Sequence, residues 1–360
     1  MAPLRRRAAL FAVGVLLAAA GLPAINLARL GRLPQAPSAL FDAGFAWPAI
    51  SSVLRRAGVS TRPRQVVVGK AGWLFIGDQY AQAITDKRRA ADANDRASAD
   101  RQAAAARAWG DWLAAHGVAH WHVLVCADKD SVYPDLLPDW DRPAAGAAID
   151  VAIERADPRV VVDTRPALRA ARAVAGPALY LRTDSHWTAR GAWIAYRRLA
   201  QAAAQPGFAW LQDADVRLRA TRLPEGDLAR LLDGRGAATD EAAAADFAVP
   251  RDARRSAADA TSGDALVASV FGALEAPPQP VLLRSPQALN ARRLLWLRDS
   301  FGAGLTPYVA ATWAEVVEVD RDGTSPEQLA AFVQRFRPDD VLVTVVERNA
   351  RADWFARMPP

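Results

Sequence analysis

The sequence predicts an α/β protein built around a mostly parallel sheet, and three observations support this fold class. Short apolar runs alternate with helical segments through roughly the last hundred residues. The runs at residues 118–127 and 341–346 are almost continuously apolar, as buried strands of a parallel sheet are. Hydrophobic residues make up 51% of the 360-residue chain, which is ample for one large core. Strands that alternate with helices imply a sheet covered on both faces.

The N-terminus carries an export signal. Arg5, Arg6 and Arg7 precede residues 8–28, which contain no charged side chain. A stretch of about 20 such residues is long enough to cross a bilayer, with the arginines on the cytoplasmic side. We therefore expect a membrane-anchor helix over residues 8–28 that sends the rest of the chain outward. The small residues 18–20 leave open a second interpretation, in which residues 1–28 are a cleaved signal peptide.

Scattered prolines and glycines over residues 29–64 predict a juxtamembrane stalk. The apolar runs at 66–68 and 73–76 follow, and the glycines between them predict a β-hairpin.

A helix is expected over residues 90–116, where alanine is abundant, apolar residues recur at helical spacing and Gly117 follows as a cap. The run 118–127 then has the character of a buried strand. Shorter strands are expected at 160–163 and 178–181, separated by helical segments.

Thr188 is a good N-cap for the next helix, whose buried face is formed by Ala192, Ala195, Tyr196, Leu199 and Ala203. Residues 213–276 show little periodicity, so we expect a loop-rich insertion there.

The last part of the chain is strongly patterned. Strands are expected at 293–298, 316–319 and 341–346, with a helix over 301–313 between the first two. Ser325-Pro326-Glu327-Gln328 is a capping box with proline at the first helical position, and it starts a helix that ends at Phe336.

The segment Asp184-Ser185-His186-Trp187 contains one of four histidines and a carboxylate two residues before it. If residues 178–183 are extended, positions two apart point the same way, so Asp184 reaches the ring of His186. A carboxylate that orients an imidazole lacks only a serine or cysteine to form a nucleophilic triad. The alternative is that His186 is a hydrogen-bonded core histidine.

Ser300 is the candidate nucleophile. An apolar run ends abruptly at Asp299-Ser300 and gives way to a helical segment. Ligands of open α/β sheets bind at the carboxyl ends of strands, which is where this serine is expected. The alternative is that Ser300 caps the helix that begins at Phe301.

Zinc binding is a further alternative, because Asp-x-His can supply ligands. His120 and His122 form a second close pair, but they lie in an expected strand and no third cluster completes a site. We predict no metal and no cofactor.

The motifs together resemble a known family. Asp184-Ser185-His186-Trp187-Thr188, with Asp299-Ser300-Phe301-Gly302 far downstream, is similar to the alginate O-acetyltransferase family of periplasmic proteins, the AlgJ and AlgX type. Further similar segments follow in the same order: Val68-Gly69-Lys70-Ala71-Gly72-Trp73, Asp128-Lys129-Asp130-Ser131-Val132-Tyr133-Pro134 and Glu225-Gly226-Asp227-Leu228.

The resemblance implies an SGNH hydrolase-like three-layer sandwich over residues 65–350, with 351–360 as a tail. It implies a triad of Asp184, His186 and Ser300, which transfers acetyl groups to an exported polysaccharide through an acetyl-serine. It also implies a periplasmic location and a multi-pass membrane acyltransferase that supplies the acetyl group. A carbohydrate esterase of the same fold and a non-catalytic polysaccharide-binding scaffold are the alternatives.

Three further residues are candidates for substrate binding. Lys129 follows an expected strand end, and Arg298 and Tyr308 flank Ser300. A solvated loop lysine, a strand-end charge and helix packing explain them equally well. The net charge of +6 comes with no basic run interleaved with aromatic residues, so we expect no nucleic-acid partner.

Overall fold

The computed structural model describes residues 20–42, 44–233, 239–248, 254–257, 265–266 and 280–360. Its centre is an eight-stranded sheet in the order β4-β3-β12-β10-β11-β9-β7-β8. The strands from β4 to β11 run parallel to one another, whereas β9, β7 and β8 add antiparallel pairings at one side. The sheet is therefore mixed and mostly parallel, as the sequence predicts.

The strands are β1 (Val66–Val68), β2 (Leu74–Ile76), β3 (His120–Cys126), β4 (Val161–Asp163), β5 (Val216–Pro224), β6 (Thr239–Phe247), β7 (Arg254–Ala257), β8 (Ala265–Leu266), β9 (Val281–Arg284), β10 (Asn290–Arg298), β11 (Trp313–Asp320) and β12 (Asp340–Val346). The numbered α-helices are α2 (Trp47–Arg56), α3 (Ala93–Ala115), α4 (Lys129–Val132), α5 (Ala148–Arg155), α6 (Arg165–Arg172), α7 (Ala189–Ala202), α8 (Asp227–Asp233), α9 (Thr306–Thr312) and α10 (Pro326–Phe336).

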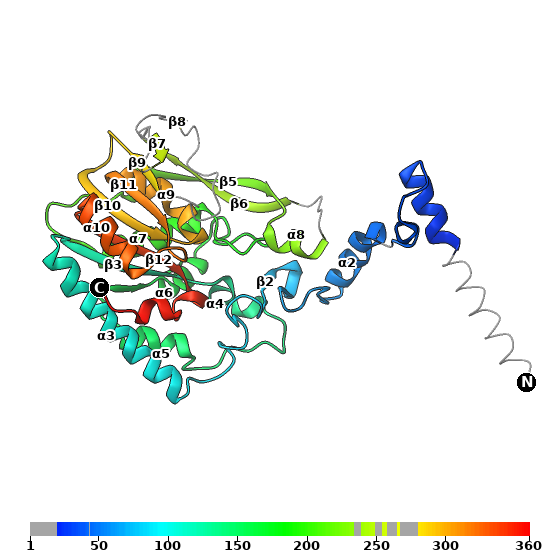
Figure 1. The fold of residues 1–360 in the computed structure, drawn as a ribbon, viewed down its shortest axis with the longest axis horizontal. Helices are drawn as coiled ribbons and strands as arrows, with labels where there is room; N and C mark the ends of the chain where they lie inside the picture. The colour runs from blue at the N-terminus through cyan, green and yellow to red at the C-terminus, as the bar shows by residue number, and fades with distance from the viewer. Residues whose placement is uncertain (1–19, 43, 234–238, 249–253, 258–264, 267–279) are drawn as a thin grey trace, which may run out of the picture.

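Two hydrophobic cores lie on opposite faces of the sheet, because successive strand residues point to opposite sides. In β10, Leu294 and Trp296 belong to the core shared with α7 and α9. Leu295 and Leu297 belong to the other core, shared with α3 and α10. Figure 1 shows these helices packed about the central strands, which gives the three layers expected.

The helix boundaries follow local capping chemistry. Asp92 accepts the N–H of Asp95 at the start of α3, and Thr188 accepts the N–H of Gly191 at the start of α7. Ser325 and Gln328 form the expected capping box of α10. The expected hairpin of β1 and β2, the strands β3, β4, β10, β11 and β12, and the helices α3, α7 and α10 are all present. The helix expected over 301–313 is split: Ser300–Leu305 is a 3-10 helix and α9 follows it.

Two expectations about local structure are wrong. Residues 178–181 are not a strand: in this segment only an isolated bridge joins Tyr180 to Trp187, because the chain turns back on itself. In the described part of residues 213–276, the chain is not the run of loops expected, since β5 and β6 form a long antiparallel hairpin and β7 and β8 join the main sheet. Most residues of β5 are partly or fully exposed, so its pattern lacked an apolar face to recognise.

The expected stalk, residues 29–64, includes a helix that packs on the domain. In α2, Ser51 Oγ donates to the carbonyl oxygen of Leu232, and Arg55 forms an ion pair with Glu225 at 3.2 Å. Figure 1 shows α2 next to α8. The tail is also packed, because Trp354 Nε1 donates to the carbonyl oxygen of Thr324.

Residues 1–19 lie outside the described residues, and they include the first part of the expected membrane anchor, 8–28, and of its alternative, a cleaved signal over 1–28. Residues 20–30 are helical. Among the residues that the structure describes, no helix is both long and apolar enough to span a bilayer.

Candidate active site

Ser300 lies at the carboxyl end of β10, where Asp299 holds the turn. One oxygen of the Asp299 carboxylate accepts the N–H of Phe301 at 3.0 Å, and the other accepts the N–H of Val346 at 2.6 Å. The second bond ties the turn to the end of β12, the neighbouring strand. Burial raises the pKa of the Asp299 carboxyl, and the charges of Arg321 and Arg348 oppose that effect. Ser300 is thus carried by a backbone fixed on two sides.

The loop between α6 and α7 brings His186 to this serine. His186 Nε2 lies 3.0 Å from Ser300 Oγ, and His186 Nδ1 lies 2.7 Å from an oxygen of Asp184. Because an ionised carboxylate only accepts, Nδ1 carries the proton and Nε2 is free to accept from the serine hydroxyl. The three residues that the sequence motifs select are therefore brought together in one hydrogen-bonded chain.

Asp184 reaches the imidazole by a different route from the one expected. The same oxygen that faces Nδ1 also accepts the backbone N–H of His186 at 2.9 Å. This bond, from the backbone of His186 to the side chain two residues earlier, forms an Asx turn. The turn directs the Asp184 carboxylate toward the imidazole, so the contact between Asp184 and His186 needs no extended strand. Ring packing of His186 against Phe301, with centroids 5.1 Å apart, supports the ring on its other side.

The Asp184 carboxylate is held in its charged form. Burial disfavours the charged form of the carboxylate. The hydrogen bond and the charge of His186 favour that form more strongly, as do the backbone N–H groups of His186 and Asp227, so the pKa of Asp184 is lowered. A charged carboxylate at this position fixes the imidazole tautomer and stabilises the imidazolium that forms when the ring takes a proton.

Lys129, a candidate for substrate binding, is buried, and its ammonium is hydrogen-bonded within the protein. Its side chain is 3% exposed, and the ammonium donates to the carbonyl oxygens of Leu181, Arg182 and Asp184 at 2.9, 3.2 and 2.6 Å. Those three bonds use its three donors and hold the loop that presents Asp184 and His186. Burial lowers the pKa of Lys129 to about 8, and Asp184 is the first of the nearby carboxylates that oppose this shift.

Arg298 and Tyr308, the other two candidates for substrate binding, are also buried. The Arg298 guanidinium is 1% exposed and pairs with Glu318 at 3.2 Å. Tyr308 is 0% exposed, and its hydroxyl donates to the carbonyl oxygen of Ala189. The ring of Tyr308, on α9, packs against Trp193 and Tyr196 of α7, and Arg298 is paired with Glu318 of β11.

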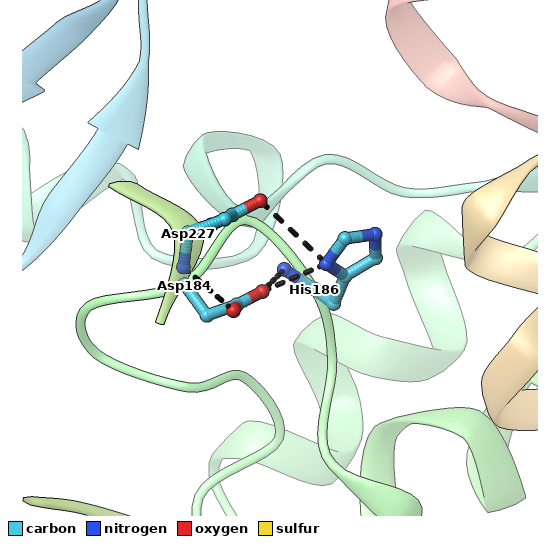
Figure 2. A group of neighbouring side chains, drawn as sticks. All are labelled: Asp184, His186 and Asp227. Carbon is cyan, nitrogen blue, oxygen red and sulfur yellow. Dashed lines mark hydrogen bonds and ion pairs between the residues drawn. The ribbon is translucent and has the colours of Figure 1, made fainter. Parts of the chain in front are cut away.

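Asp227 was not among the predicted site residues, although it belongs to a segment that resembles the family. Its backbone N–H donates to the second oxygen of Asp184 at 2.9 Å, and its carboxylate accepts from Ser185. Figure 2 shows both carboxylates directed at the Nδ1 side of His186. The resemblance of the segment Glu225-Gly226-Asp227 to the family was the signal in the sequence. The spacing of this segment did not indicate that Asp227 contacts Asp184 and Ser185.

Asp184, His186 and Asp227 each offer one ligand atom, and these atoms lie within 4.8 Å of one another. Such a set has the donor types of a cation site. The donors are already committed to one another, however, since Nδ1 faces Asp184 and Asp227 binds Ser185. The other histidine pair lies on β3, where burial lowers the pKa of His122 to about 4.

A buried charge network lies beside the site, where β3 ends. Lys87 Nζ donates to Asp128 at 3.1 Å and to Asp130 at 2.9 Å, and Glu347 lies 3.6 Å away. Burial raises the pKa of Asp130 to about 6, against the opposing charge of Lys87. The loop around Lys129 is therefore held by internal ion pairs on both sides of that residue.

Comparisons with known proteins agree with this architecture. The model of the SGNH hydrolase-like domain of the acetyltransferase AlgX matches residues 66–276, which include Asp184 and His186 and end before Ser300. No curated protein matches the sequence.

Solved structures show the same fold at low sequence identity. Bacillus cereus PatB1 is 13% identical, with a TM-score of 0.58 over 81% of this chain and 98% of its own. The same protein solved with a sulfonyl adduct is 13% identical, with a TM-score of 0.58 over 82% and 97%. A DHHW family protein from Eubacterium siraeum is 17% identical, with a TM-score of 0.57 over 84% and 97%.

Proposed function

The chain belongs to the family of SGNH hydrolase-like acetyltransferases of the AlgX type, and from this premise we propose that it transfers acetyl groups to the hydroxyls of an exported polysaccharide. The observation that carries the proposal is the hydrogen-bonded chain from Ser300 through His186 to Asp184. A serine hydroxyl is a weak nucleophile until a base removes its proton, and His186 is placed to do so.

The first half-reaction loads the enzyme. Ser300 Oγ attacks the carbonyl carbon of the acetyl donor while its proton passes to His186 Nε2. The backbone N–H of Ser300 stabilises the oxyanion, a contribution of about 3–4 kcal/mol for one such donor. Collapse of the intermediate breaks the bond to the leaving group, which takes the proton from His186, and Ser300 is left acetylated.

The second half-reaction removes the acetyl group from Ser300. A sugar hydroxyl replaces the donor, gives its proton to His186 and attacks the acetyl carbon, so that the acetyl group leaves Ser300 for the sugar. Ser300 then recovers the proton, and no cofactor is required. An esterase differs only in that water replaces the sugar hydroxyl, so the acceptor decides between the two activities.

The proposal includes a cellular setting. The family is periplasmic, which suits an exported chain anchored in the inner membrane by residues 8–28 and supplied with acetyl groups by a multi-pass acyltransferase. A phosphatase fused after residue 60 tests this topology: activity supports export, and an inactive fusion of full length contradicts it.

The test of function combines a chromogenic acetyl ester with a panel of acceptor oligosaccharides. We expect release of the chromophore and a sugar whose mass rises by one acetyl group. Ser300→Ala and His186→Ala should each lower the rate about a thousandfold or more, because members of one catalytic unit do not act additively. Asp184→Ala should retain more activity, since Asp184 orients the base and moves no proton. Release of acetate with no acetylated sugar across the panel would favour an esterase.

A further inference from the structure

A second carboxylate contacts the segment that carries the base. Asp227 Oδ1 accepts the backbone N–H of Ser185 at 2.7 Å, and its Oδ2 accepts the Ser185 hydroxyl at 2.5 Å. Its own N–H binds Asp184, as described above. Asp227 therefore bonds to both residues that precede His186, and through them it limits the positions that the ring can adopt.

The direction of the Ser185 hydroxyl follows from this contact. Its single proton points to Asp227, because a carboxylate has no proton to give. The lone pairs of Ser185 Oγ are then left to face His186 Nδ1, which lies 3.2 Å away. A lone pair at this distance favours a proton on Nδ1, the tautomer that leaves Nε2 unprotonated toward Ser300.

Asp227 also places charge near the ring. Its Oδ2 lies 3.8 Å from His186 Nδ1, and its side chain is 34% exposed. The charged groups about this loop include Asp184, the ammonium of Lys129, Arg182, and Asp240, which binds Thr183 and lies 3.8 Å from Arg182. A negative charge at 3.8 Å favours the protonated imidazole.

The fold supplies this carboxylate through a close approach of two segments. A Cβ on Gly226 would lie 2.1 Å from Asp184 Cβ, so only glycine lets the two backbones come together here. The Gly226 N–H donates to Thr183 Oγ1 at 2.9 Å, and the Ala229 N–H donates to the Thr183 carbonyl oxygen at 3.1 Å. The start of α8 is thus docked on the catalytic loop.

We propose that Asp227 is a positioning residue for the base, an inference that rests on the proposed function of the site. It orients the Ser185 hydroxyl, keeps the His186 proton on Nδ1, and stabilises the imidazolium formed when Nε2 takes the Ser300 proton. Asp227 itself exchanges no proton and touches no substrate. The two carboxylates therefore have separate tasks. Asp184 binds the ring of His186, and Asp227 holds Ser185, the residue between Asp184 and His186.

The experiment measures the reactivity of Ser300 directly with an arylsulfonyl fluoride. Ser300 Oγ bonds to sulfur, fluoride leaves, and the serine proton passes to His186, so the labelling rate reports activation of the nucleophile without an acetyl group or an acceptor. The rate constant is followed by intact mass from pH 4 to 9 for the full chain. Ser300→Ala identifies the labelled residue.

We expect Asp227→Asn to lower the plateau labelling rate about tenfold or more, while the melting temperature stays close to that of the wild type. Loss of the charge should also move the acid limb of the pH profile to lower pH, because the imidazolium loses a stabilising neighbour. Ser185→Ala should lower the plateau but leave the acid limb in place, since the Asp227 charge remains. Asp246→Asn is the matched control, as Asp246 is exposed and pairs with Arg219 on the β5–β6 hairpin.

An Asp227→Asn profile that superimposes on that of the wild type overturns the inference alone. A lower rate with an unmoved acid limb and a lowered melting temperature overturns it as well, because Asp227 would then only stabilise the fold. A wild-type chain that the sulfonyl fluoride does not label at Ser300 overturns both this inference and the proposed function, since there is then no activated serine to position.

Discussion

At the scale of single residues, burial separates the residues that act from those that support them. Ser300 and His186 are partly exposed, whereas Lys129, Arg298 and Tyr308 are enclosed. Of these five side chains, only the first two reach the surface. The enclosed side chains make main-chain and ion-pair contacts within the protein, and their positions in the sequence did not indicate that burial.

Lys129 provides a prediction about alkaline pH. Its ammonium holds three carbonyl oxygens of the catalytic loop, and burial lowers its pKa to about 8. As pH rises through that value the amine becomes neutral and loses a donor, so we expect ester cleavage to fall above about pH 8. Lys129→Met should remove this limb, lower kcat about tenfold at neutral pH, and cost about 2 kcal/mol of stability, because carbonyl groups lose their partner.

The control for that experiment is Lys70→Met, because Lys70 pairs with the exposed Asp139. Its pH–rate profile should match that of the wild type. An alkaline limb that persists unchanged in Lys129→Met would show that another group titrates there.

The sequence predicted that Asp184, His186 and Ser300 lie close together but missed the residues that support them, for one physical reason. A motif such as Asp184-Ser185-His186 encodes a local turn, and a strand that ends at Asp299-Ser300 marks an edge of the sheet. Asp227 meets Asp184 across 43 residues, and only the folded chain defines that contact. Likewise, the loop position of Lys129 gave no information about the segment that covers it.

At the scale of elements, the approach of α8 to the catalytic loop depends on one glycine. Gly226→Ala would place a methyl group 2.5 Å from Asp184 Oδ2, so Asp184 must move. A displacement of about 1 Å near a catalytic base can cost about a hundredfold in rate, and we expect a loss of that order in kcat with a small change in KM.

Gly110→Ala is the control for this prediction. Gly110 lies on α3, and its new methyl group would meet only the indole of Trp121, on β3, at 3.2 Å. It should keep wild-type kcat. A Gly226→Ala enzyme with full activity would mean that the start of α8 can move away from Asp184 without consequence, which contradicts the close docking described here.

Elements with strong local signals were predictable, and those defined by distant pairing were not. Capping residues predicted the starts of α7 and α10, and continuous apolar runs predicted β3 and β12. The strands β5 and β6 were missed because β5 is rich in exposed polar residues and β6 contains four consecutive alanines, Ala242–Ala245, so neither shows a clear alternation. Residues 178–181 look like a strand, but they pair within a turn.

At the scale of the whole molecule, the alternation of strands and helices determines where the chemistry occurs. The parallel order β3-β12-β10-β11 places the ends of β3, β10 and β12 along one edge. This edge carries Ser300 after β10, the Val346 N–H of β12 that binds Asp299, and the loop before α7 with its histidine. The hydrophobic periodicity of the sequence predicted this layered arrangement. It did not predict the antiparallel pairings of β9, β7 and β8.

The central claim is that Ser300 carries the acetyl group, and rapid quenching tests it most directly. The full chain is mixed with p-nitrophenyl acetate in the absence of any sugar acceptor, stopped in acid, and mapped by peptide mass spectrometry. We predict one acetyl group on the peptide that contains Ser300, no such adduct in Ser300→Ala, and its disappearance when an acceptor oligosaccharide is added before the quench. Continued ester turnover by Ser300→Ala, or an acetyl group on a different residue that is passed on to the sugar, would contradict the account.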